Sequence, residues 1–406
     1  MRVDRDRLWR RLMTMAEVGP GVAGGSNRQA LSDEDRDGRN LFIEWAEAAG
    51  CTSEFDEIGN LFVRRPGSDP ERAPVLVGSH LDTQPTGGRF DGVYGVLGGL
   101  EVIETLNDEG IELAAPLEVA VWTNEEGSRF QHSMMGSAVW AGLLSLDEAR
   151  ALVDVDGISV GEELDRHGWA GNRPAAPSEY GATFELHIEQ GPILESEALE
   201  IGVVTAVQGL RWYTLELFGH PAHAGPTPMD DRRDPARALG AVISDVYAMA
   251  AEFAPWARAT FAMFRSEPVS PNTVPERIAC SLDLRHPDGD VLQTMDERLG
   301  AIVAAHCGAH GVESAITVDN DSPPVQFDET CTAAVESAVV GLGFSHQRMV
   351  SGAGHDACYV ARHAPTSMIF VPCDDGLSHN EAENISPDQA ERGASVLLNA
   401  VLEVAR

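Results

Sequence analysis

The sequence predicts an α/β fold in which a mixed, mostly parallel sheet is flanked by helices and carries an inserted α+β domain. Its 406 residues exceed the length of one ordinary domain, so two domains and a large core are expected. Short apolar runs alternate with helical patterns over most of the chain, whereas the middle part carries alternating apolar and polar residues. Hydrophobic residues make up 43% and charged residues 23%, a balance typical of globular proteins rather than disordered ones.

The first elements along the chain are two helical patterns, at 8–15 and 33–49, and Gly50 follows the second at the position of a C-terminal cap. Another helical pattern runs over 96–106 and closes at Gly110. Short apolar runs predict strands that are buried on both faces, at 75–77, 117–122, 184–188 and 368–371. Strands that alternate with helices favour a largely parallel sheet.

The segment 209–324 follows a different pattern. Its alternating segments include 212–218, 279–285 and 315–319, and its two helical stretches lie near 235–253 and 291–305. We interpret this segment as having the order βαββαβ. That order predicts a small ferredoxin-like α+β domain, and the pair Pro323–Pro324 is suited to a return hinge. We therefore expect one domain from residues 1–208 and 325–406, and a second from residues 209–324.

The net charge of the chain is −35, from 64 acidic residues against 29 basic ones, and every basic residue is arginine. A surface this negative repels nucleic acid and anionic membranes, so neither is an expected partner. One interpretation is a moderately acidic mesophilic enzyme. The other is a protein from a high-salt cytoplasm, where salt screens the repulsion between carboxylates. The absence of lysine favours the halophilic interpretation.

No apolar run is long enough to span a bilayer, and no signal-type segment follows the charged start MRVDRDRLWRRLM. We expect a cytoplasmic protein. The six cysteines are scattered without a CxxC spacing, which indicates reduced thiols and argues against a metal cluster built on sulfur.

His80 ends the first buried strand, in VLVGSHLDT. Ligands of open α/β sheets bind at the carboxyl ends of the strands, so this histidine is delivered to the binding crevice. Asp82 is placed to accept the second ring N–H of His80 and to fix its tautomer. A lone histidine at a strand end is more often a satisfied polar residue than a metal ligand, so this interpretation depends on the other residues.

Carboxylates and further histidines occupy comparable places. Asp91, in GGRFDGVYG, stands at the start of a helical pattern, where a simple N-cap is the alternative interpretation. Glu125 and Glu126 follow the strand 117–122. One interpretation places both carboxylates on a solvent-exposed loop; in the functional interpretation one binds a metal while the other acts as a base. His187 in FELHIEQG and His379 in CDDGLSHNE also follow predicted strands. Together these residues form a set suited to Zn, Mn, Co or Ni.

With these motifs the chain resembles the hydantoinase/carbamoylase amidase branch of the M20 metallohydrolases. This branch contains N-carbamoyl-L-amino acid hydrolases, allantoate amidohydrolases and ureidopropionases. The resemblance runs from about residue 41 to the C-terminus and is carried by GSHLDTQPTGGRFDGVYGVLGGLE, WTNEEGSRF, ELHIEQGP, HAGPTPMDDRRD, PNTVP, SGAGHDA and GLSHNEAE. His187 is telling, because peptidases of the wider group usually have a carboxylate there. Pro226 departs from the threonine that is usual in the branch.

The resemblance implies a di-metal exopeptidase-like catalytic domain, in which Asp91 bridges two divalent ions (Zn, or Mn, Co or Ni). His80 and His187 would complete one site, Glu126 and His379 the other, with Glu125 as general base. It also implies that Gln190, His223, Asn272 and Arg285 contact substrate, His223 by reaching the site of a partner subunit. The inserted domain would serve as lid and dimerisation domain of a homodimer.

These assignments imply hydrolysis of the ureido C–N bond of an N-carbamoyl-L-amino acid, or of a related ureido acid such as allantoate, with release of ammonia and carbon dioxide. Two divalent ions ~3.5–4 Å apart repel each other by roughly 20 kcal/mol at an effective dielectric near 20, so anions must lie between them. Asp91, Glu126 and a hydroxide contribute −3 against +4, which favours an anionic substrate. The alternatives are an aminoacylase or dipeptidase of the same fold, and a catalytically silent binding or oligomerisation protein.

Overall fold

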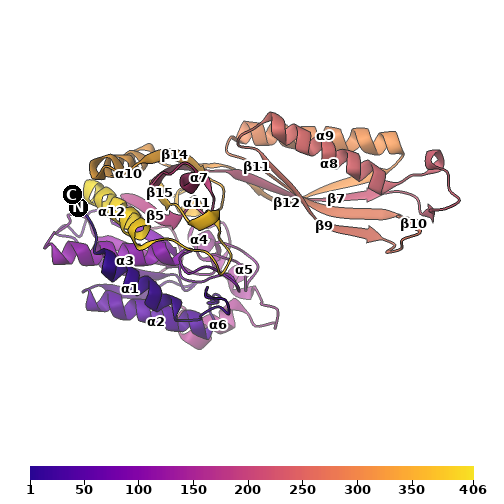
Figure 1. Cartoon of the computed structure of the whole chain (residues 1–406). Helices are drawn as coiled ribbons and strands as arrows, with labels where there is room; N and C mark the ends of the chain where they lie inside the picture. Colours follow the sequence, from indigo (N-terminus) through magenta and orange to yellow (C-terminus); the bar gives the residue numbers. More distant parts are fainter. The chain divides into compact units, whose positions relative to one another are not determined.

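The computed structural model describes residues 1–406, which divide into two compact units. Unit 1 comprises Met1–Thr205 and Gln326–Arg406, and unit 2 comprises Ala206–Val325. Each unit has its own hydrophobic core, and Figure 1 labels many of the elements of both. None of the helices combines the length and the hydropathy that crossing a bilayer requires.

Unit 1 is built on a nine-stranded sheet in the order β1-β2-β4-β3-β5-β15-β6-β13, with β14 paired to β6. The four central strands β4, β3, β5 and β15 are parallel, while β1 pairs antiparallel with β2, β2 with β4, and β6 with β15. The strands are β1 (Thr52–Phe55), β2 (Leu61–Arg65), β3 (Val75–His80), β4 (Leu117–Trp122), β5 (Ala182–Ile188), β6 (Ile201–Val207), β13 (Val325–Gln326), β14 (His346–Ser351) and β15 (Thr366–Val371). The predicted mixed, mostly parallel sheet is confirmed.

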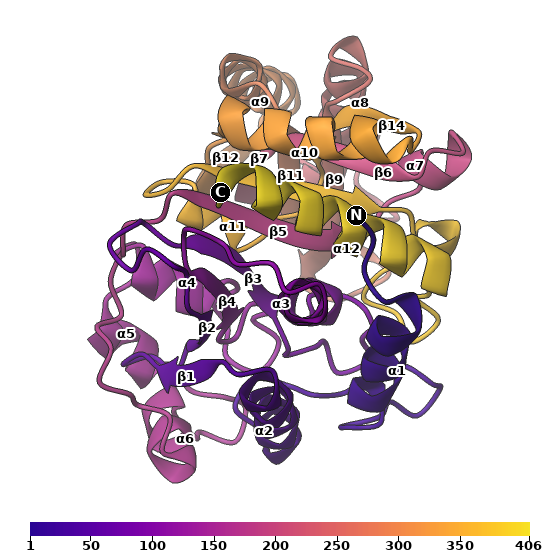
Figure 2. The same cartoon turned by 90° about the vertical axis from the view of Figure 1, so that its left-hand side faces the viewer.

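Helices cover both faces of the central strands. Every residue of β3 is buried, and its side chains alternate between two cores. Val75 and Val77 belong to the core on the side of α3, whereas Leu76 packs with Trp122 and Trp140 on the other face. Figure 2 shows α3 and α12 in front of the sheet. The helices are α1 (Arg5–Ala16), α2 (Asp33–Ala48), α3 (Val93–Asp108), α4 (Met135–Trp140), α5 (Leu146–Ala151), α6 (Val160–His167), α7 (Ile193–Ser196), α10 (Glu329–Leu342), α11 (Ala357–Val360) and α12 (Pro387–Val404), with the 3₁₀ turn η2 (Asp374–Gly376).

Unit 2 holds a four-stranded antiparallel sheet in the order β12-β7-β11-β9, with α8 and α9 on one face. Its elements are β7 (Gly209–Phe218), β8 (Ala222–His223), η1 (Met229–Asp231), α8 (Pro235–Glu252), β9 (Arg258–Glu267), β10 (Thr273–Val274), β11 (Arg277–His286), α9 (Gly289–His310) and β12 (Glu313–Ser322). β8 and β10 form a separate two-stranded sheet. The main sheet and its helices follow the predicted βαββαβ order, which confirms the ferredoxin-like α+β class.

The hairpin of β1 and β2 was not predicted. Its strands extend the sheet antiparallel beyond β4. The side chains of β1 are alternately exposed and half-buried, and charged residues such as Glu54 and Arg64 interrupt the apolar pattern. β2 does bury Leu61, Phe62 and Val63, but this short apolar run is followed directly by two arginines, so the pattern does not stand out in the sequence.

Candidate metal and catalytic site

The parallel strands of unit 1 deliver polar side chains to one edge of the sheet. His80 is the last residue of β3, and His187 is the residue before the last of β5. Glu125 and Glu126 follow β4, and His379 follows β15 after the turn η2. Because β4, β3, β5 and β15 run parallel, their carboxyl ends share this edge.

Asp91 lies immediately before α3, but it is not the N-cap of that helix. The cap position is Gly92, which has a φ of 66° and makes no side-chain cap hydrogen bond. A Cβ at Gly92 would lie 2.3 Å from the ring of His80, so the close approach of backbone and imidazole requires glycine here. The carboxylate of Asp91 therefore faces the imidazoles, which excludes the N-cap interpretation.

The two carboxylate oxygens of Asp91 face different histidines. Oδ1 lies 3.1 Å from Nε2 of His187 and 3.7 Å from Nε2 of His80, whereas Oδ2 lies 3.5 Å from Nε2 of His379. Oε2 of Glu126 is 3.3 Å from the same nitrogen of His379. Two groups of potential ligands result, His80–Asp91–His187 and Asp91–Glu126–His379, each with its ligand atoms within 4.8 Å. Asp91 belongs to both groups.

The tautomers of two buried histidines suit them for metal binding. Nδ1 of His80 lies 2.8 Å from the main-chain oxygen of Asp82, and Nδ1 of His187 lies 2.9 Å from that of Ile188. A carbonyl oxygen only accepts, so each Nδ1 carries the hydrogen and each Nε2 keeps a lone pair. The N–H of Gly92, which donates to Nε2 of His187, agrees with this tautomer. Imidazole nitrogens and carboxylate oxygens in this arrangement fit a divalent transition metal.

Asp82 contacts different partners from those predicted. Its carboxylate is 4.0 Å from Nδ1 of His80, and it accepts hydrogen bonds from the backbone N–H groups of Glu125 and Glu126 instead. The expectation that this carboxylate fixes the His80 tautomer is therefore wrong, because the main-chain oxygen of Asp82 reaches the ring. The Asp82 side chain instead positions the loop that carries the two glutamates.

Glu125 and Glu126 are adjacent but have different surroundings. Oε2 of Glu125 lies 3.5 Å from Nε2 of His80, whereas the carboxylate of Glu126 accepts from the backbone N–H and the side-chain amide of Gln84. Burial raises the pKa of Glu125 well above its ordinary value, and the carboxylates of Asp356 and Glu126 raise it further. Burial and Asp91 likewise raise the pKa of Glu126. A cationic ligand would relieve this crowding of carboxylates.

Three residues at this edge hold a left-handed backbone that non-glycine residues seldom adopt. Asn124, Gln190 and His379 have φ values of 56°, 55° and 52°. Each such residue costs on the order of 1–3 kcal/mol, and residues of this kind cluster at functional sites. Asn124 turns the chain directly before Glu125, and the backbone at His379 sets the direction of its own ring.

The four residues expected to contact substrate are divided between the units. Gln190 lies in unit 1, where its Nε2 donates to Oδ2 of Asp91 at 2.9 Å and its buried Oε1 has no hydrogen-bond partner. His223, Asn272 and Arg285 lie in unit 2. His223 is exposed on β8. The backbone N–H of Ala224, the residue after His223, donates to the backbone oxygen of Asn272. Arg285, on β11, forms an ion pair with Asp283 at 2.8 Å.

Several side chains at this edge were missed from the sequence. Gln84 holds Glu126, and Ser378 and Glu383 contact Asp91. The ring of His355, in SGAGHDA, lies 4.6 Å from that of His187. All four residues lie in or beside the motifs that resemble the M20 branch, and this position in the sequence is the only signal that could have identified them.

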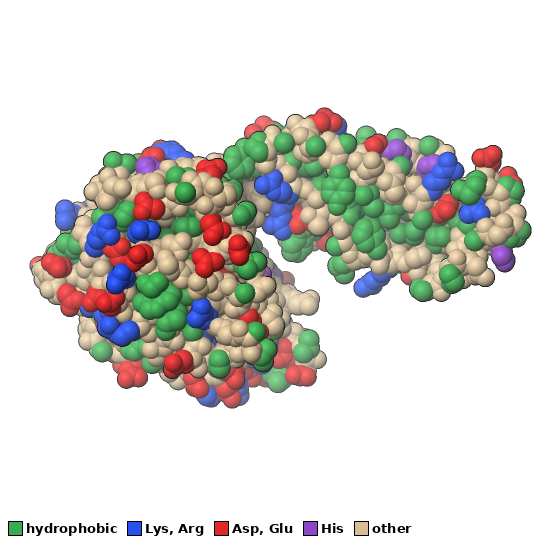
Figure 3. Space-filling model, viewed as in Figure 1, with side chains coloured by type: hydrophobic (Ala, Val, Ile, Leu, Met, Phe, Trp, Pro, Cys, Tyr) green, Lys and Arg blue, Asp and Glu red, His purple; other side chains and the backbone are tan.

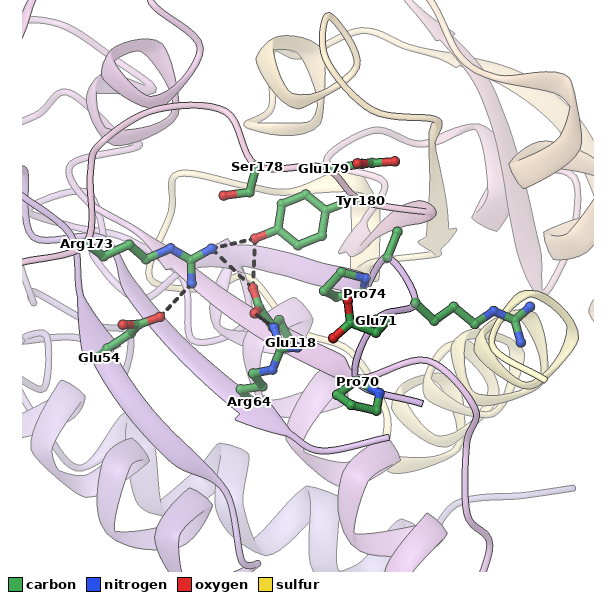
Figure 4. Close-up of a pocket in the computed structure, with 12 residues that line it drawn as sticks. Glu54, Arg64, Pro70, Glu71, Pro74, Glu118, Arg173, Ser178, Glu179 and Tyr180 are labelled. Carbon is green, nitrogen blue, oxygen red and sulfur yellow. Dashed lines mark hydrogen bonds and ion pairs between the residues drawn. The ribbon is translucent and has the colours of Figure 1, made fainter. Parts of the chain in front are cut away.

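A cavity of about 420 Å³ lies at the other end of the sheet, where β3, β4 and β5 begin (Figure 4). Its buried carboxylate, Glu118, accepts from Arg64 at 2.6 Å, Tyr180 at 2.7 Å and Arg173 at 3.3 Å. The main charged groups of this cavity thus bond to one another. This arrangement is typical of a structural ion cluster rather than of a catalytic site.

Comparison with known proteins decides the family. Peptidase family M20/M25/M40 matches residues 76–403. The chain belongs to this family. It is 48% identical to an N-carbamoyl-L-amino-acid amidohydrolase of Rhizobium meliloti, over 100% of this chain and 97% of the relative. It is 32% identical to an allantoate amidohydrolase of Bacillus subtilis (strain 168), over 96% and 95%.

A solved structure agrees with these relatives. The amidase of the hydantoinase/carbamoylase family from Burkholderia multivorans is 51% identical, with a TM-score of 0.96 over 100% of this chain and 98% of that one. The resemblance to the hydantoinase/carbamoylase branch is confirmed. This family member is a hydrolase of carbon–nitrogen bonds. The family depends on metal ions, and the two groups that share Asp91 are its candidate metal ligands.

Proposed function

We propose that this hydrolase cleaves the ureido C–N bond of N-carbamoyl-L-amino acids or of related ureido acids such as allantoate. The products would be ammonia, carbon dioxide and the free amine. The observation that carries the proposal is the position of Asp91 between two sets of ligands, with Glu125 beside one of them. The names of the relatives in Rhizobium meliloti and Bacillus subtilis support the substrate class.

The proposed cofactor is a pair of divalent ions, zinc or manganese, cobalt or nickel. His80 and His187 would hold one ion, Glu126 and His379 the other, and Asp91 both. When bound, such ions lower the pKa of water and polarise a carbonyl oxygen. They would also favour the ionised form of Glu125, whose pKa burial and the neighbouring carboxylates raise.

The remaining chemistry belongs to side chains of this chain. Glu125 takes a proton from the attacking water and passes it to the leaving nitrogen as the C–N bond breaks. The unpartnered Oε1 of Gln190 can accept a hydrogen bond from a substrate N–H. His223 would stabilise oxyanion charge, Arg285 would bind the substrate carboxylate with its fork of N–H donors, and Asn272 would make a further polar contact.

The assay that tests this function measures ammonia and free amine. N-carbamoyl-L-amino acids, allantoate and ureidopropionate are compared with N-acetyl amino acids and dipeptides, each with added Mn, Co, Ni or Zn and at low and high salt. We expect ammonia release from at least one ureido acid, and kcat/KM values for acetyl and peptide substrates lower by about 10²-fold or more, since the site must recognise the carbamoyl group. Preferential cleavage of acetyl or peptide substrates would contradict the proposal.

We also propose that the protein is a homodimer formed through unit 2. This unit exposes large apolar side chains on the strands of its sheet, at Trp212, Met263, Phe264, Ile316 and Val318. Hydrophobic side chains gather on this unit in Figure 3. Met263 and Phe264 are 68% and 57% exposed on the edge strand β9, and an exposed apolar edge is a site of association.

Sedimentation velocity tests the dimer. We expect the wild-type protein to sediment as a dimer, and the double variant Met263→Glu, Phe264→Glu to sediment as a monomer, because charges at an apolar interface are costly to bury. The control is Val155→Glu in unit 1, at a side chain that is 98% exposed, and it should remain dimeric. A double variant that remains dimeric would contradict an interface on β9.

A further inference from the structure

Glu383 is a buried carboxylate that none of the proposed chemical steps uses. It lies four residues after His379, has no exposed surface and forms no ion pair with arginine or histidine. A Cβ at Gly88 would lie 2.0 Å from the carboxyl group of Glu383, so the chain leaves room for this side chain. Burying a carboxylate without an ion-pair partner costs free energy unless hydrogen bonds stabilise it, so Glu383 depends on its hydrogen bonds.

These bonds lead to Asp91 by two routes. Oε1 of Glu383 accepts the backbone N–H groups of Phe90 at 3.0 Å and of Asp91 at 3.1 Å. Oε2 is 3.0 Å from Oγ of Ser378, and the same oxygen of Ser378 lies 2.9 Å from Oδ2 of Asp91. One carboxyl group thus contacts the main chain of Asp91 directly and its side chain through a hydroxyl.

The same contacts connect two loops that are far apart in the sequence. Asp91 precedes α3, whereas Ser378, His379 and Glu383 lie between β15 and α12. Oδ2 of Asp91 faces His379, which is itself next to Ser378 in the chain. A change at Glu383 therefore acts on both members of the Asp91–His379 pair, and less directly on His80 and His187, which face Oδ1.

We propose that Glu383 is a positioning residue for the shared carboxylate of Asp91 and for the loop of His379. This inference rests on the proposed role of Asp91 as a ligand to two ions. Groups that orient metal ligands by hydrogen bonds change metal affinity or activity by about 10- to 100-fold when they are replaced. Here the effect would fall on the ion that Glu126 and His379 would hold.

Calorimetric titration of the metal-free full-length protein with Mn²⁺ alone tests the proposal. For Glu383→Ala we expect the first equivalent to bind as in wild type and the second to bind about 10- to 100-fold more weakly. Glu383→Gln keeps an acceptor for the two N–H groups and a polar atom for Ser378, so it should restore most of that affinity. Ser378→Ala removes only the second route, and we expect a smaller loss at the same equivalent.

The control is Glu118→Gln, at a buried carboxylate that accepts three hydrogen bonds far along the sheet from the site. It should lower the melting temperature and leave both Mn²⁺ equivalents unchanged. Wild-type affinity for the second equivalent in Glu383→Ala, or equal weakening in Glu118→Gln, would overturn the positioning role. If Glu383→Ala does not fold, wild-type affinity for the second Mn²⁺ equivalent in Ser378→Ala would overturn the positioning role. A wild-type protein that binds a single equivalent would instead contradict the two-ion proposal.

Discussion

Glu125→Gln is expected to keep both metal equivalents and to lower kcat by several orders of magnitude, roughly 10³- to 10⁴-fold. The amide has nearly the shape of the carboxylate but cannot take a proton from the attacking water. Glu125 is also not a member of either group of ligands that share Asp91. The measurements are metal content after dialysis and steady-state kinetics on the best ureido substrate.

The neighbouring residue provides the matched comparison. Glu126→Gln makes the same chemical change one position along the chain, but Glu126 lies 3.3 Å from the ring of His379 within a ligand group. We expect this variant to lose metal as well as activity, and excess metal to recover part of its activity. Near-normal turnover in Glu125→Gln would remove Glu125 from the role of base. Loss of metal in that variant would make it a ligand.

Asp91→Asn is expected to abolish binding of the second ion and to lower kcat/KM by about 10³-fold or more, as loss of a central catalytic group does. The variant replaces an anion with a neutral amide between two groups of ligands. Two cations held close together repel strongly, and a shared carboxylate offsets that repulsion. The measurements are Mn²⁺ titration and activity over a wide range of metal concentrations.

The control for this variant is Asp374→Asn. Asp374 is an exposed carboxylate in the loop before His379, and it accepts from Asn384 rather than facing the ligands. We expect it to bind two equivalents and to turn over substrate as wild type does. An Asp91→Asn protein that still holds two ions tightly would show that no shared carboxylate is needed.

Much of this site could be predicted because its residues follow buried strands. The apolar runs that end near His80, Glu125 and His187 correspond to β3, β4 and β5, and parallel strands bring such ends together wherever they lie in the chain. The assignment of roles needed more than this pattern. The resemblance of whole motifs to one family separated Asp91 from an ordinary helix cap.

Other features depended on backbone directions that no local pattern records. The main-chain oxygen of Asp82, rather than its carboxylate, reaches the ring of His80. Gln84 and Glu383 are ordinary polar residues in the sequence, and only the fold brings them to Glu126 and Asp91. The halophilic character indicated by the missing lysines stays a prediction.

The sequence by itself determined the fold class, the family and the set of histidines and carboxylates, because burial periodicity and motif order are written along the chain. Only the tertiary structure decided which oxygen of Asp91 faces which histidine, and which groups support these ligands. Such contacts join residues that are up to about three hundred positions apart, as Asp91 and Glu383 are. Hydrogen bonds of this kind depend on ångström-scale positions that packing of the whole sheet and its helices sets.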